Sequence, residues 1–209
     1  MLQTRGGMKI IKFVILIGML LSTQYVVIAK DIICDPDQSI ENQKIKIISD
    51  DAKILLAKIV KDKISLAWPV EVCKCWISSL FGPRRSGFHN GIDLAAPKKT
   101  PVYAAADGIV EIVQMSDDPK GYGNMILLAH KNSDYKTRYA HLDSVLVNQN
   151  DAVDQGKQIG TVGATGHVVA KTAKSDPSHL HFELYRGSGR VNPLIALFAT
   201  DKKWVKSQM

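Results

Sequence analysis

The sequence lacks the features that mark several specialised protein classes. Its 209 residues contain three cysteines and 7% aromatic residues, with no internal repeat and no low-complexity tract. Helical and strand-like segments do not alternate, which argues against a parallel α/β sheet. No basic patch with interleaved aromatic residues accompanies the net charge of +7, so we expect no nucleic-acid partner. The mild positive charge suits an anionic polymer such as a cell wall, or simply a soluble basic surface.

A targeting segment is present at the N-terminus. Lys9 and Lys12 precede a charge-free run from Phe13 to Ala29 that is rich in Ile, Leu, Val and Met. A basic region, an apolar region and a small residue at the end are typical of a signal peptide. The run is slightly shorter than the ~20 residues of a comfortable membrane span. Residues 1–29 are therefore predicted to be a signal peptide, or else an uncleaved anchor.

Either interpretation places the remaining chain outside the cytoplasm, in the periplasm or extracellular space. Membrane contact is expected only if the segment is not cleaved. In an oxidising compartment Cys34, Cys73 and Cys75 could form one disulfide, whose pairing the sequence leaves open. Cys73 and Cys75 are predicted to share one face of a strand.

The mature chain divides into three parts. Residues 30–66 form an extension with a predicted helix, because Ser49 is a good N-cap and an apolar stripe follows it to about Lys63. Residues 67–198 form the main domain, and 199–209 form a polar tail. Six strands are predicted in the main domain, at residues 102–106, 108–114, 124–130, 136–141, 158–162 and 180–185. Asp107-Gly108 is a tight-turn signal between the first two. We therefore expect a mainly antiparallel β domain with a short N-terminal helical extension.

Chemistry-bearing residues gather on the polar faces of three extended segments. Side chains of a strand alternate between its two faces. In residues 88–94, His89, Gly91 and Asp93 then point one way, and Gly91 leaves space between the other two. The opposite, apolar face, with Phe88, Ile92 and Leu94, is expected to anchor the segment in the core. In residues 179–184, the polar face carries His179, His181 and Glu183. In residues 138–142, it carries Tyr139 and His141. Two histidines and a carboxylate suffice for a catalytic zinc site that keeps one position open for water.

The main domain resembles the lysostaphin-like zinc endopeptidases, peptidase family M23, from about Trp68 to Pro193. The matching blocks occur in the family's order. They lie at residues 77–84, 88–97, 100–108, 121–124, 139–142, 159–166 and 179–183, and they include Phe81-Gly82-Pro83-Arg84, Phe88-His89-Asn90-Gly91-Ile92-Asp93-Leu94 and His179-Leu180-His181-Phe182-Glu183. The resemblance implies an antiparallel β-sheet sandwich of the duplicated-hybrid-motif type.

The resemblance also implies a function. His89, Asp93 and His181 correspond to the family's ligands for one zinc ion, and His141 and His179 to its two further active-site histidines. The expected activity is hydrolysis of peptide crosslinks in bacterial peptidoglycan, with the D-Ala–diaminopimelate bond favoured over a glycine bridge. The expected partners are peptidoglycan stem peptides. Glu183 could support His181 from behind, whereas His130 and His167 are predicted to be non-catalytic.

The sequence leaves the substrate and one alternative function open. The segment from His167 to Ser178 is longer than is usual in the family, which affects substrate preference. The alternative function is that of an inactive member that binds peptidoglycan or regulates a hydrolase. A biotin or lipoyl carrier domain is disfavoured, because the chain has no Met-Lys-Met hairpin and a carrier would leave the histidines unexplained.

Overall fold

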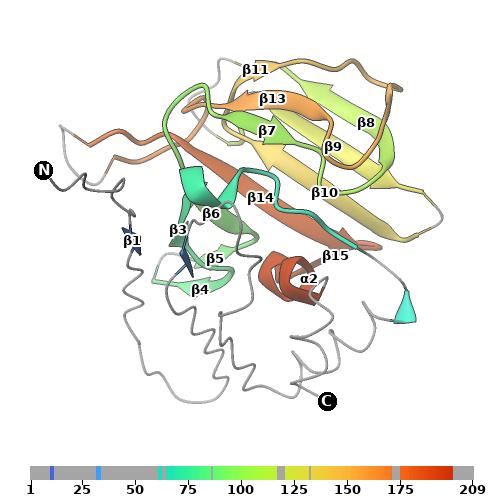
Figure 1. Cartoon of the computed structure of the whole chain (residues 1–209), viewed down its shortest axis with the longest axis horizontal. Helices are drawn as coiled ribbons and strands as arrows, with labels where there is room; N and C mark the ends of the chain where they lie inside the picture. The colour runs from blue at the N-terminus through green and yellow to red at the C-terminus, as the bar shows by residue number, and fades with distance from the viewer. Residues whose placement is uncertain are drawn as a thin grey trace, which may run out of the picture.

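The computed structural model describes residues 10–11, 32–33, 61–62, 65–85, 87–116, 121–131, 133–170 and 175–199. Strands dominate these residues (Figure 1). The predicted signal segment 1–29, the helix predicted from Ser49 and the tail 199–209 fall largely outside them, and so does Cys34. No helix among the described residues is long and apolar enough to cross a membrane.

An eight-stranded antiparallel sheet forms the body of the domain. Its strands follow the order β12 (Ala152–Val153), β8 (Gly108–Gln114), β9 (Met125–His130), β10 (Tyr135–Ala140), β14 (His179–Arg186), β6 (Ile92–Ala95) and β3 (Trp76–Ser79), and β15 (Gly189–Val191) pairs with β14. The long strand β14 crosses the middle of the molecule and pairs with three partners: β10, β6 and β15.

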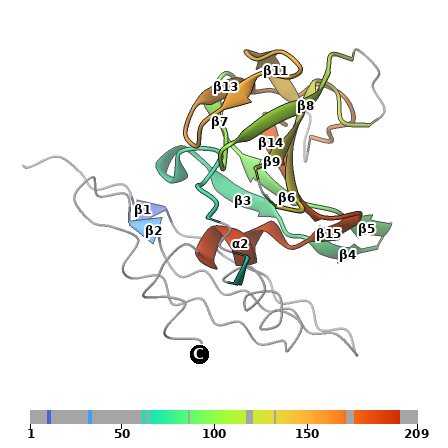
Figure 2. The same cartoon turned by 90° about the vertical axis from the view of Figure 1, so that its right-hand side faces the viewer.

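Smaller elements cover this sheet. A three-stranded sheet joins β11 (Leu142–Val145), β13 (Gln158–Val162) and β7 (Pro101–Tyr103), and a hairpin joins β4 (Gly82–Arg84) to β5 (Gly87–His89). The other elements are β1 (Ile10–Ile11) paired with β2 (Ile32–Ile33), the 3₁₀ helix η1 (Val72–Lys74) and α2 (Pro193–Ala199). Figures 1 and 2 show the three-stranded sheet above the main sheet and α2 below β14 and β15.

The hydrophobic core lies between the two sheets and extends to α2. Leu180 and Phe182 of β14 are fully buried and belong to the same cluster as Val102 and Ile159 of the small sheet and Leu197 of α2. Burial of one such side chain contributes about 1.5–3 kcal/mol. This apolar face of β14 fixes which of its residues point the other way, toward the candidate site.

The prediction of a mainly antiparallel β domain is confirmed, and all six predicted strands are present with small shifts of their ends. Two local expectations were wrong. Residues 72–74 form η1 instead of a strand, so Cys73 and Cys75 do not share a strand face; the Cys75 thiol is buried in the core. Strands β7 and β8 flank the Asp107-Gly108 turn but do not pair with each other, because β7 joins the small sheet and β8 the large one.

Candidate metal centre

Three strands bring His89, Asp93 and His181 together. His89 ends β5, Asp93 lies in β6, and His181 lies directly opposite Asp93 in the register of β6 and β14. Antiparallel partners in direct register point to the same face of a sheet. The two side chains on β6 and β14 are therefore adjacent by sheet geometry alone, and the β4–β5 hairpin adds the third.

The extended conformation predicted for residues 88–94 is wrong at its centre. The backbone bends at Gly91, so that β5 pairs with β4 while β6 joins the main sheet. Phe88 consequently does not anchor the segment in the core: its side chain is 56% exposed and its ring packs edge-on against Phe81, with 5.0 Å between ring centroids. Ile92 and Leu94 are fully buried, as expected.

Gly91 permits a close approach between backbones. The structure contradicts the idea that it leaves open space between His89 and Asp93. A β-carbon added at Gly91 would lie only 2.3 Å from the carbonyl oxygen of Phe182 on β14. The missing side chain thus lets the bend between the ligand-bearing strands sit directly on β14.

The three candidate ligand atoms converge on one point. His89 Nε2 lies 3.1 Å from Asp93 Oδ1 and 3.1 Å from His181 Nδ1, and His181 Nδ1 lies 2.8 Å from Asp93 Oδ1. Atoms that each lie about 2.1 Å from a tetrahedral zinc ion would be about 3.4 Å apart. The observed spacing is slightly tighter and fits such an ion.

Hydrogen bonds on the far side of each ring determine which nitrogens carry a proton. His89 Nδ1 donates to the carbonyl oxygen of Leu80 at 2.7 Å, and His181 Nε2 donates to Glu183 Oε1 at 3.1 Å. In the neutral tautomers, His89 Nε2 and His181 Nδ1 then present lone pairs to each other and to the Asp93 carboxylate. Three mutually facing acceptors with 6–14% side-chain exposure call for a cation between them.

The pKa shifts indicate that the cluster favours a positive charge beside Asp93, whether from protons or from a metal. Burial alone would raise the pKa of Asp93, but the hydrogen bonds that His181 and His89 donate to it when their rings are protonated, together with the charge of those rings, hold it well below its usual range. Burial opposes protonation of His181, yet Asp93 and Glu183 raise its pKa overall. Arg84 Nη2 binds the outer oxygen of Asp93, Oδ2, at 3.1 Å. Only Oδ1 therefore faces the centre of the cluster.

His141 and His179 lie side by side next to this cluster. Their ring centroids are 4.9 Å apart, and His179 Nε2 is 3.8 Å from Asp93 Oδ1. Each ring donates its Nδ1 proton to a backbone carbonyl at 2.8 Å, His141 to Thr165 and His179 to Pro177. In the neutral rings both Nε2 atoms are therefore acceptors. Burial, followed by the charge of His179, lowers the pKa of His141 to about 4, which keeps it neutral at pH 7.

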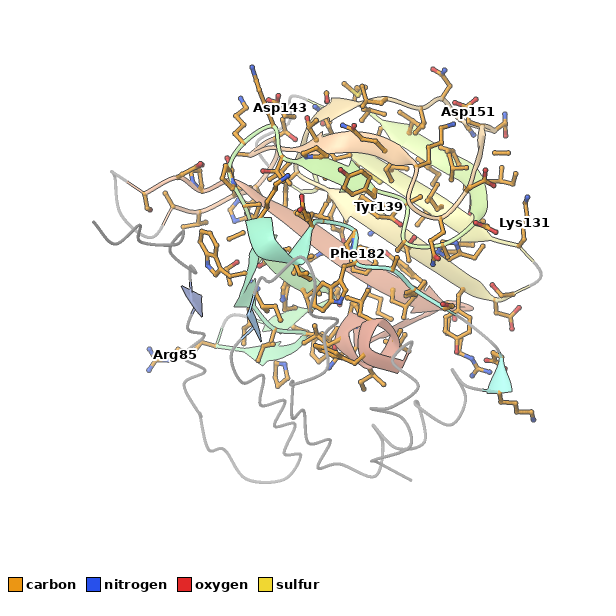
Figure 3. All side chains as sticks on the ribbon, viewed as in Figure 1. Arg85, Lys131, Tyr139, Asp143, Asp151 and Phe182 are labelled. Atoms are coloured by element: carbon orange, nitrogen blue, oxygen red, sulfur yellow. The ribbon has the colours of Figure 1, made fainter. Side chains whose placement is uncertain are left out.

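His141 reaches the site through a turn and not through strand alternation. Its φ of 62° is left-handed, and β10 ends one residue before it. The expectation that Tyr139 shares its face is wrong: Tyr139 is fully buried, and its hydroxyl accepts a hydrogen bond from the Ala105 amide at 2.8 Å. Figure 3 shows Tyr139 and Phe182 near the centre of the molecule. Their ring centroids are 5.3 Å apart.

The other two histidines lie outside the cluster. His130 is buried, donates from Nδ1 to the carbonyl oxygen of Asp107 at 3.0 Å and contacts Thr137 Oγ1 through Nε2 at 2.9 Å. His167 is exposed in a loop whose residues 171–174 are not among those described.

Sequence reasoning missed two residues near the cluster: Arg84, which contacts Asp93, and Arg138, which contacts Glu183 behind His181. Arg84 was noted only as part of a motif, and its contact with Asp93 requires the β4–β5 hairpin. Arg138 was not singled out, although it lies directly opposite Glu183 in the register of β10 and β14. A strand-pairing prediction could have found this pair, because opposite charges in direct register attract each other.

The comparisons with known proteins point to one family. Residues 87–193, just over half of the chain, match the model of peptidase family M23. Peptidoglycan DD-endopeptidase ShyA of Vibrio cholerae is 39% identical over 149 residues, which cover 68% of this chain and 32% of the relative. Murein hydrolase activator NlpD of Escherichia coli is 38% identical over 128 residues, covering 61% of this chain and 30% of the relative.

A solved structure extends the likeness to the fold. The crystal structure of a zinc-containing peptidase from Vibrio cholerae matches with a TM-score of 0.53 and 35% identity, covering 64% of this chain and 39% of that one. In the two relatives ShyA and NlpD, the region that matches this chain makes up about a third of the relative's length. The family match, the antiparallel β architecture and the clustered histidines and aspartate lead to one conclusion: this chain belongs to peptidase family M23.

Proposed function

We propose that this chain is a zinc-dependent endopeptidase that hydrolyses peptide crosslinks of peptidoglycan, with the D-Ala–diaminopimelate bond as the favoured target. The observation that carries the proposal is the convergence of His89 Nε2, Asp93 Oδ1 and His181 Nδ1, all acceptors, within 3.1 Å of one another. These atoms would hold one zinc ion. Zinc, when bound, supplies a Lewis acid that acidifies a water molecule to a pKa near 7 and polarises a substrate carbonyl.

The chain's own residues supply the proton transfers. His141 and His179 present free Nε2 atoms at the edge of the cluster, and their Nδ1 protons are tied to backbone carbonyls. Each imidazole is positioned to accept a proton from the attacking water at Nε2 and to return one to the leaving amine. The hydrogen bonds at Nδ1 stop the rings from rotating, so the acceptors keep their aim. Either ring could also stabilise the oxyanion of the tetrahedral intermediate.

The second candidate function is that of an inactive domain that binds peptidoglycan or regulates a hydrolase. The relative named as a murein hydrolase activator, 38% identical, supports this candidate. The endopeptidase is favoured because the two Nε2 acceptors lie beside the candidate ligands, an arrangement that a binding domain does not need.

A digestion experiment tests the choice. Purified protein is incubated with isolated peptidoglycan, and released muropeptides are identified by mass spectrometry. We expect crosslink cleavage with the wild type, loss of cleavage after chelation, and recovery with added zinc. His179→Ala and His141→Ala should bind zinc but release nothing, whereas His167→Ala, an exposed histidine outside the cluster, should behave as wild type. The proposed endopeptidase activity would be contradicted if the protein were isolated without bound metal, or if it cleaved no type of peptidoglycan.

The proposal includes export and domain limits. Residues 1–29 act as a signal peptide or anchor, residues 67–198 form the peptidase domain, and the protein works in the periplasm or extracellular space. The relatives support a cell-envelope location, since one, 34% identical, is an Escherichia coli protein described as a lipoprotein. Mass determination of the mature protein tests this directly: cleavage near Ala29 is expected, and recovery of the full-length chain in the cytoplasm would contradict export.

A further inference from the structure

Behind the candidate metal centre, Glu183 lies at the middle of a buried polar cluster. Its carboxylate has no solvent exposure. Oxygen Oε1 accepts hydrogen bonds from Tyr122 at 2.7 Å and from His181 Nε2 at 3.1 Å. Oxygen Oε2 accepts from Arg138 at 3.0 Å and from the Tyr185 hydroxyl. A buried carboxylate needs such partners, because desolvation of an unpaired charge is costly.

The partners of Glu183 hold one another as well as the carboxylate. The Arg138 guanidinium lies 4.3 Å from the Tyr122 ring centroid and 5.1 Å from that of Tyr185, and Arg190 of β15 lies 5.1 Å from the Tyr185 ring centroid. Cation–π contacts at these distances favour a fixed stack. The position of the Glu183 carboxylate is therefore restricted by its four hydrogen-bond donors, which are Tyr122, His181, Arg138 and Tyr185.

The orientation of Glu183 has a direct consequence for His181. Both ring nitrogens of His181 face a carboxylate, which only accepts hydrogen bonds. A metal held beside Asp93 would displace the proton on that side, so the one remaining proton of His181 would lie on the nitrogen that faces Oε1. That nitrogen is Nε2, which leaves Nδ1 with its lone pair directed at Asp93 Oδ1, 2.8 Å away. His89 has the opposite arrangement, with Nδ1 protonated and Nε2 facing the cluster. The ligand atom of each histidine is set by what lies behind it.

Tyr122 connects Glu183 to His141. Its hydroxyl donates to Glu183, while its backbone carbonyl accepts the His141 amide at 2.9 Å. That amide belongs to the left-handed residue that turns the chain out of β10. Glu183 is thus linked through one residue to the backbone position of His141.

We propose that Glu183 is a positioning residue that selects Nδ1 of His181 as the metal-binding atom, and that Arg138 and Tyr122 hold its carboxylate in place for that task. This inference rests on the proposed function, because it requires a metal at His89, Asp93 and His181. A purely structural ion pair with Arg138 is the competing explanation. In that case, loss of the ion pair would change only the stability of the fold, and the protonated nitrogen of His181 would stay the same.

Three variants separate the two explanations. Glu183→Ala removes the acceptor of His181 Nε2, whereas Glu183→Gln keeps an acceptor oxygen but removes the charge that pairs with Arg138. Tyr185→Phe is the matched control, since it removes a hydrogen bond to the same carboxylate without touching His181. Zinc affinity is measured by competition with a chelator, thermal unfolding is measured on the zinc-free protein, and long-range ¹H–¹⁵N spectra of the zinc-loaded protein report the His181 tautomer.

We expect Glu183→Ala to weaken zinc binding by roughly 10- to 100-fold and to lose the single Nε2–H signal of His181. Glu183→Gln should be less stable than wild type, because a buried guanidinium loses its partner, yet should keep the tautomer and most of the affinity. Tyr185→Phe should lower stability alone. Wild-type affinity and tautomer in Glu183→Ala would overturn the inference, as would an equal loss of affinity in all three variants. A wild type that does not bind zinc would instead refute the proposed function.

Discussion

Replacing Gly91 with alanine tests how the candidate ligands are held, without altering any residue that carries chemistry. Gly91 sits at the bend between His89 and Asp93, against the strand that carries His181. The added β-carbon would lie 2.3 Å from the Phe182 carbonyl oxygen and 2.9 Å from its carbon. These atoms belong to the backbone of a central strand, which cannot swing aside as a flexible side chain would.

The size of the effect follows from the clash. Ordinary carbon–oxygen contacts begin near 3.3 Å, so the bend must retreat by about 1 Å from β14. Metal-site geometry tolerates only about 0.2 Å in ligand distances. A displacement of about 1 Å at a reacting centre can reduce the rate by roughly 100-fold, and overpacking of this kind destabilises by about 1–3 kcal/mol. Gly91→Ala should therefore lose zinc affinity and cleavage activity by at least 100-fold while the protein still folds.

Gly189→Ala is the matched control. Its β-carbon would lie 3.6 Å from the nearest atom, the Arg186 carbonyl oxygen, which is an ordinary contact, and Gly189 has no left-handed φ. Zinc affinity by chelator competition and muropeptide release should be unchanged in this variant. Circular dichroism establishes that both variants are folded. A folded Gly91→Ala variant that binds zinc as tightly as wild type would show that this close approach does not set the ligand positions.

The remaining predictions concern His141, His179 and Tyr139. His141→Ala and His179→Ala should keep near-native zinc affinity and lose cleavage by about 100-fold or more, because neither ring is one of the three converging ligands. The pKa of His141 falls from 6.5 to about 4 on folding, mainly through burial, so the unfolded chain takes up its proton first. Between pH 6.5 and 4 this residue should cost zinc-free protein up to about 3 kcal/mol of unfolding free energy, a loss absent from His141→Gln. Tyr139→Phe should destabilise by about 1–3 kcal/mol, since the Ala105 amide loses its acceptor, and leave zinc affinity unchanged.

Each of these predictions has an outcome that would contradict it. A loss of zinc in either single histidine variant would make that histidine a ligand. Urea unfolding curves whose difference between wild type and His141→Gln does not change from pH 7 to pH 4 would contradict the burial of a neutral His141. Weakened zinc binding in Tyr139→Phe at unchanged stability would place Tyr139 in the site after all.

Short-range patterns in the sequence predicted the parts of this fold that depend on strand alternation. On β14, Leu180, Phe182 and Leu184 fill the core while His181 and Glu183 face the candidate site, as a period of two requires. The same reasoning failed where the backbone departs from a strand. It put Phe88 in the core and Tyr139 beside His141, because neither the bend at Gly91 nor the left-handed turn at His141 has a counterpart in simple alternation.

By itself, therefore, the sequence determined the antiparallel β class and the family motifs, and the family resemblance carried by those motifs implied the five residues proposed for the site. Tertiary structure alone decided how they meet. The register that sets Asp93 opposite His181 and the contact of Glu183 with Arg138 join residues far apart in the chain, and the β4–β5 hairpin brings Arg84 to Asp93, nine residues away. The physical reason is that contacts between neighbouring strands form only when the sheet is assembled, whereas residue alternation describes one strand at a time.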